Sequence, residues 1–150
     1  MPDEYLETTV DKFIFKVKKD LLYSDAGVWV QIEDGEARLG LTDYLQQSIG
    51  DIAFVEPSAV GTQLSARDSL MDIETIKVTM ELPSPVSGKL IQVNEELEMT
   101  PELVNEDPYG AGWLARVALD DWETDRQNLL DAERYLEVMR KQALEEMEKL

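Results

Sequence analysis

The chain has 150 residues, with 32 acidic against 14 basic side chains and a formal net charge of −18. This balance argues against binding to nucleic acid or to an anionic membrane, because both need a basic surface, and it favours partners with basic docking faces, although acidity also serves solubility. Cysteine and histidine are both absent. Any redox or acyl chemistry must therefore come from a cofactor or a partner.

The first half of the chain has the pattern of strands followed by a short helix. Its acidic start, Met1–Glu4, has no apolar run typical of a signal or transit peptide, which predicts a cytoplasmic protein. The expected elements are a strand at 9–18, a turn at 24–27, a strand at 28–32, a hairpin turn at 33–36, a strand at 37–41 and a helix at 42–49. Thr42 is the expected N-cap of the helix, and Gly50 is its expected stop.

The second half continues with short strands separated by glycine and proline. The expected elements are strands at 51–55, 69–76, 78–82 and 88–93, a turn-rich stretch at 94–112 and a strand at 113–119. Such regular short strands indicate a sandwich or barrel. Trp29, Phe54 and Trp113 are expected in the core.

The end of the chain has a helical period. Thr124 to Gln127 has the pattern of a capping box, and apolar residues then recur every three or four positions to Leu150. We expect a domain at 1–124 and an amphipathic helix at 125–150 packed on it. Binding of the helix face that includes Leu136 and Met147 to another chain is the alternative.

Lys77 is the most informative residue. It is the only lysine or arginine between Arg67 and Lys89, and apolar residues flank it on both sides. If the flanking runs are strands, Lys77 lies at a hairpin tip as a flexible primary amine that can be acylated without disturbing a core. Glu74, three residues earlier, is placed to orient a modifying enzyme. An ordinary solvated lysine is the alternative interpretation.

Several motifs together resemble one family, the glycine cleavage system H proteins. The matching segments are Gly40–Tyr44, Asp51–Glu56, Glu74–Lys77, Ser84–Gly88, Asn94–Leu97 and Pro101–Leu114. The resemblance implies a mainly β (α+β) fold of the biotinyl/lipoyl-like hammerhead type, with two small antiparallel sheets, short helices and a long C-terminal helix. It implies a non-catalytic carrier with lipoic acid in amide linkage on Lys77. The site then comprises Lys77 with Glu74, Thr75, Ile76 and Val78 around the modified turn.

The resemblance leaves the pathway open. H proteins usually have His-Glu before the first tryptophan, where this chain has Gly27-Val28. That departure, the acidity and the long tail favour the related lipoate-binding proteins of heterodisulfide reductase-like sulfur oxidation, which carry sulfur intermediates. The alternative is a glycine cleavage H protein carrying an aminomethyl group between glycine decarboxylase and aminomethyltransferase. In both cases a lipoate ligase or transferase and dihydrolipoyl dehydrogenase are expected partners.

Two other functions fit the sequence less well. An unmodified interaction module would use the acidic surface and the long helix alone. A biotin carrier is disfavoured because Met-Lys-Met is typical there, whereas Ile76-Lys77-Val78 stands here.

Overall fold

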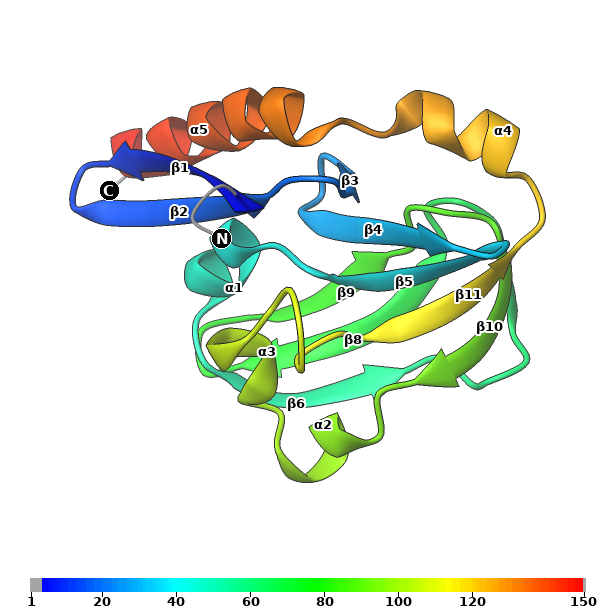
Figure 1. The fold of residues 1–150 in the computed structure, drawn as a ribbon. Helices are drawn as coiled ribbons and strands as arrows, with labels where there is room; N and C mark the ends of the chain where they lie inside the picture. Colours follow the sequence, from blue (N-terminus) through cyan, green and yellow to red (C-terminus); the bar gives the residue numbers. More distant parts are fainter. Residues whose placement is uncertain (1–3, 150) are drawn as a thin grey trace.

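Two antiparallel sheets that face each other form the body of the molecule (Figure 1). The structure is a computed structural model that describes residues 4–149. One sheet has the strand order β3-β4-β5-β11-β10-β7 and the other the order β6-β8-β9. Their strands are β3 (Leu22–Tyr23), β4 (Val28–Glu33), β5 (Glu36–Leu41), β6 (Ile52–Pro57), β7 (Gln63–Leu64), β8 (Ser69–Thr75), β9 (Thr79–Pro83), β10 (Gly88–Val93) and β11 (Ala115–Leu119). The predicted mainly β fold is confirmed.

The main core lies between these two sheets. Leu39 of β5 and Val117 of β11 are fully buried on one side, and Ile73 of β8 and Leu82 of β9 are fully buried on the other, all in a single apolar cluster. The exposed residues Asp72 and Glu74 alternate with Ile73 along β8, as expected for a strand with one wet face. Burial on one face fixes the register of β8 against β9, and so fixes which residues form their tip.

A third, two-stranded sheet corrects the prediction of one strand at 9–18. The chain forms a hairpin of β1 (Tyr5–Val10) and β2 (Phe13–Lys18), which turns at Asp11 and Lys12. Asp11 adopts the left-handed conformation, with φ of 57°. Aspartate tolerates this conformation, so the turn forms without the glycine or proline that would have marked it in the sequence.

The helix at the end of the chain begins later than predicted. The chain first forms α4 (Trp122–Asp125) and a 3-10 turn (Arg126–Asn128). Extended residues follow, and Leu130 forms an antiparallel bridge with Tyr23 of β3. α5 (Ala132–Glu148) then starts with Asp131 as its N-cap, which accepts a hydrogen bond of 2.9 Å from the Arg134 amide. The prediction of one uninterrupted helix from residue 125 was therefore wrong. Asp125 instead accepts a hydrogen bond from the Ser87 amide, which ties α4 to the sheet.

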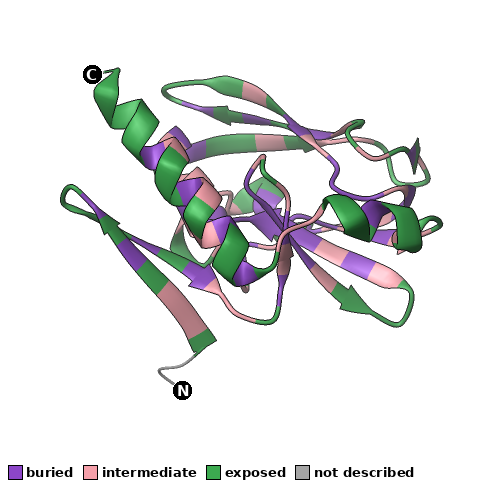
Figure 2. Ribbon diagram, turned by 90° about the horizontal axis from the view of Figure 1, so that it is seen from above, coloured by how far each residue is buried: buried purple, intermediate pink, exposed green. Residues whose placement is uncertain are grey.

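α5 packs mainly on the β1–β2 hairpin and also contacts β3, the edge strand of the six-stranded sheet. Tyr135, Met139 and Ala143 are buried in a second apolar cluster with residues of the hairpin, and the rings of Tyr135 and Tyr23 stack at 4.7 Å. Figure 2 shows buried residues recurring along α5, while its last turn is exposed. No helix within residues 4–149 is long and apolar enough to cross a membrane.

The remaining helices are short. α1 (Asp43–Ile49) has the predicted limits: the Thr42 side chain accepts from the Leu45 amide, and Gly50 ends the helix with φ of 85°. The stretch 94–112, predicted only as turns, contains α2 (Glu96–Met99) and α3 (Leu103–Glu106). Phe54, expected in the core, is 46% exposed, because β6 is an edge strand with one face in solvent.

Candidate functional site

The five predicted site residues meet at the tip of the β8–β9 hairpin. Glu74 pairs with Thr79 as the last matched position of the two strands. Beyond it, the Thr75 amide donates to the Val78 carbonyl at 2.8 Å, and the Val78 amide donates to the Thr75 hydroxyl at 3.0 Å. Ile76 and Lys77 are left at the tip. Thr75 is buried, and its amide and hydroxyl both bond within the turn. These bonds hold the base of the tip, while Ile76 and Lys77 extend beyond it.

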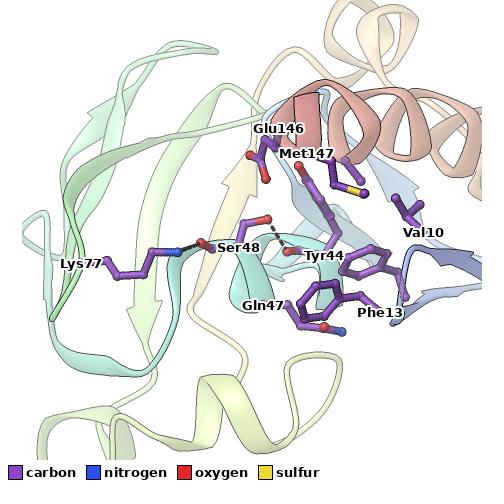
Figure 3. Close-up of a pocket in the computed structure, with 10 residues that line it drawn as sticks. Val10, Phe13, Tyr44, Gln47, Ser48, Lys77, Glu146 and Met147 are labelled. Atoms are coloured by element: carbon purple, nitrogen blue, oxygen red, sulfur yellow. Dashed lines mark hydrogen bonds between the residues drawn. The ribbon is translucent and has the colours of Figure 1, made fainter. Parts of the chain in front are cut away.

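Lys77 presents its amine toward the C-terminal end of α1. Its Nζ donates to the Ser48 carbonyl oxygen at 3.1 Å (Figure 3). Carbonyls in the last turn of a helix lack intrahelical partners and attract cations, which explains this contact. The contact is exposed to solvent.

Glu74 does not pair with Lys77. Among residues 4–149 the ion pairs within 4.0 Å are Arg116–Glu36 and Arg126–Glu123. Glu74 is exposed on β8, beside Phe54 of β6. The Glu74 carboxylate therefore lies on the surface next to Lys77, where an approaching protein can contact it.

The turn between α1 and β6 lies next to the aliphatic part of the Lys77 side chain. The sequence analysis did not predict this contact. A Cβ placed on Gly50 would lie 3.6 Å from Cδ of Lys77, so the lysine stem runs directly over the turn. Asn105 of α3 holds the turn: its amide nitrogen donates to the Gly50 carbonyl at 3.0 Å, and its oxygen accepts from the Ile52 amide at 2.9 Å. Only a comparison of related sequences could have revealed it, because Asn105 is far along the chain from Gly50.

Replacing Asn105 with alanine is expected to loosen this support. The variant loses both backbone contacts and a third hydrogen bond to Gln46, so we expect the free energy of unfolding to fall by about 2–3 kcal/mol. Chemical denaturation measures the change. Asn128→Ala is the matched control, because Asn128 is exposed, and it should change stability by less than about 0.5 kcal/mol. Equal losses in the two variants would contradict the supporting role of Asn105.

Comparison with known proteins agrees with this geometry. The family model described as glycine cleavage H-protein matches residues 21–142. The chain belongs to the glycine cleavage H-protein family. A probable glycine cleavage system H protein of Pyrococcus horikoshii is 44% identical over 127 residues, covering 84% of this chain and 94% of that protein. The glycine cleavage system H protein of Aeromonas hydrophila is 46% identical over 124 residues, covering 82% and 95%.

A solved structure extends the similarity to the fold. The crystal structure of a glycine cleavage system H protein from Mycobacterium marinum has a TM-score of 0.69 and 32% identity, and the match covers 79% of this chain and 95% of that one. The predicted family is thus confirmed, and the prediction of a non-catalytic carrier agrees with it. The names of these H-protein relatives favour glycine cleavage, the alternative from the sequence, over sulfur oxidation, its first choice.

The H-protein match leaves out both ends of the chain. The β1–β2 hairpin precedes residue 21, and the last turns of α5 follow residue 142. α5 as a whole contacts the hairpin, and β2 contacts α1. The hairpin and the end of α5 thus lie outside the part of the chain that the family model matches.

Proposed function

We propose that this chain is the lipoyl carrier of a glycine cleavage system and that Lys77 bears the lipoyl group. The observation that carries the proposal is the position of Lys77: an exposed amine at an anchored hairpin tip, in a member of the H-protein family. Lipoic acid in amide linkage would supply a dithiolane that accepts electrons together with the aminomethyl group. The residues of the chain supply position and recognition.

The hairpin tip fits such a group. Ile76 is 91% exposed and Val78 is 40% exposed, so a modifying enzyme meets an apolar surface on both sides of the amine. The Thr75 hydrogen bonds keep the strands paired behind the tip, so acylation of Lys77 requires no repacking. The chain has no cysteine, and therefore no internal thiol competes for the arm by disulfide exchange.

The same proposal names the partners. Glycine decarboxylase and aminomethyltransferase would use the arm in turn, dihydrolipoyl dehydrogenase would reoxidise it, and a lipoate ligase or transferase would attach it. The net charge of −18 suits docking faces that are basic, because complementary fields speed encounter. The heterodisulfide reductase-like complex is not part of the proposal, since the named relatives give it no support.

Intact-mass measurement of the protein purified from its own source tests the attachment. We expect a mass increase equal to one lipoyl amide, and peptide mapping should place it on Lys77 and not on Lys89, the next lysine along the chain. An unmodified Lys77 in cells supplied with lipoate would refute the carrier function and favour the interaction module.

A further inference from the structure

A row of hydrogen-bond donors crosses the outer face of the six-stranded sheet. The register of β4, β5, β11 and β10, which lie side by side in Figure 1, places four side chains next to one another: Gln31, Arg38, Arg116 and Gln92. Ala37 and Leu39, on either side of Arg38 in β5, are buried in the main core, so Arg38 points to the opposite face. We call these four residues the arginine row.

The arginine row carries two positive charges that acidic residues neutralise only in part. Arg38 and Arg116 are direct partners on adjacent strands, a position in which like charges destabilise a sheet. Glu36 contacts Arg116 at 3.5 Å, whereas Arg38 has no ion pair within residues 4–149 and lies over the Trp113 ring, 4.9 Å from its centre. Opposed arginines therefore weaken the sheet, although the chain has 32 acidic against 14 basic side chains. Such a cost to the fold indicates a role in binding.

Both arginines also have a donor without an acceptor. Within the described part of the chain, the buried side-chain atoms that lack a hydrogen-bond partner are Nε of Arg38, Nε of Arg116 and the Tyr44 hydroxyl oxygen. Buried donors without partners are destabilising and uncommon. A carboxylate accepts two parallel N–H bonds from one guanidinium. An aspartate or glutamate of a partner would thus supply the missing acceptor once the guanidinium turns to meet it.

A recess of about 490 Å³ adjoins the arginine row. Gln92 lines it together with Trp113, the residue on which Arg38 stacks, and the exposed side chain of Val60 lies at its wall. Arginine and tryptophan are among the side chains most enriched at the centres of protein interfaces. The row and the recess together fit a protein segment that has carboxylates next to an apolar side chain.

We propose that the arginine row docks an acidic surface segment of one of the enzymes that use the lipoyl arm. The inference rests on the proposed carrier function. Two arginines in a chain of net charge −18 do not suit nucleic acid, whose many phosphates the remaining surface would repel. A two-fold contact between copies of this chain would place arginine against arginine. An acidic partner is the occupant whose charge complements the row.

The position of the row suits an enzyme that also reaches Lys77. β5, which carries Arg38, continues through Thr42 into α1, and the Ser48 carbonyl near the end of α1 accepts from the Lys77 amine. The chain from Arg38 to the end of α1 spans at most about 25 Å, less than the roughly 30 Å diameter of a small domain. An enzyme docked on the row is therefore within one domain's width of the root of the arm.

Steady-state kinetics with the lipoylated carrier tests the docking. Glycine decarboxylase, aminomethyltransferase and dihydrolipoyl dehydrogenase are each assayed at varied carrier concentration, with the wild type and with the double variant Arg38→Gln, Arg116→Gln. With one of the three enzymes we expect the KM for the carrier to rise roughly tenfold and kcat to stay unchanged, because the variant loses charged docking contacts but keeps the arm. The wild-type KM with that enzyme should rise with salt concentration, and the variant KM should not.

The double variant Arg126→Gln, Arg134→Gln is the matched control. It removes the same total charge from two exposed arginines outside the sheets, so every KM should stay at the wild-type value. Equal rises in KM in the two double variants would overturn the docking site, since net charge alone would then explain them. Denaturation midpoints check for a structural role: the row variant should be at least as stable as the wild type, because opposed like charges are gone. A lower midpoint with unchanged KM values would overturn the inference.

The remaining outcomes separate the docking site from the carrier function. An unchanged mass of the wild type after treatment with lipoate ligase would reject the lipoylation and the docking inference together. A correctly lipoylated wild type whose three KM values do not respond to the row variant would reject the docking site alone. Sedimentation that finds a wild-type dimer and a monomeric row variant would make the row a contact between copies, and would overturn the assignment to an enzyme.

Discussion

Lys77→Arg is expected to abolish carrier function while leaving the fold intact. Arginine keeps the positive charge and can still donate to the Ser48 carbonyl, so the hairpin tip should be undisturbed. Its guanidinium stays protonated at any physiological pH and is not a nucleophile for acyl transfer. We expect no mass increase on treatment with lipoate ligase, and glycine-dependent release of CO₂ by glycine decarboxylase at the level measured without carrier.

Lys89→Arg is the control for Lys77→Arg. Lys89 is an exposed lysine on β10, and its replacement should leave lipoylation and turnover unchanged. Carrier activity that survives in the Lys77 variant would refute the assignment of the arm. A fully lipoylated wild-type protein that glycine decarboxylase cannot reduce in the presence of glycine would keep the carrier function but reject the pathway.

The sequence predicted those parts of the fold that depend on interactions between residues close together along the chain. Thr42 and Gly50 limit α1 because a hydroxyl cap and a positive-φ glycine act within one turn of the chain. Lys77 was placed correctly at a tip because alternating burial on β8 and β9 fixes where the strands separate. Both features depend on neighbours close in sequence.

The features that the sequence did not predict depend on contacts far along the chain. The helix break before Asp131 is tied to Asp125 binding the Ser87 amide and to Leu130 pairing with Tyr23, residues 38 and 107 positions away. The pocket beside Lys77 is lined by four segments of the chain, at residues 10–15, 44–48, 77 and 143–147. Periodicity carries no information on such pairings, so these features needed the tertiary structure.

The three-dimensional structure also explains why the motif Ser84–Gly88 ends in glycine. Gly88 begins β10 and is buried between Leu64 of β7 and Leu119 of β11, with φ of 152°. A Cβ there would overlap the Ala118 carbonyl oxygen and stand 2.8 Å from a Val117 methyl group. Both the backbone conformation and the closeness of the neighbouring strand therefore require glycine.

Gly88→Ala is accordingly expected to lower the free energy of unfolding by about 4 kcal/mol, because backbone strain and steric clash in a packed sheet each contribute about 1–3 kcal/mol. Gly61→Ala is the matched control: Gly61 also has a positive φ, of 99°, but no atom lies within 4 Å of its added Cβ. It should cost about 1 kcal/mol, from the backbone alone. Denaturation midpoints measure both. If the two variants were equally stable, the closeness of β11 would contribute nothing to the loss of stability. Gly88 would then be required only because its backbone φ is positive.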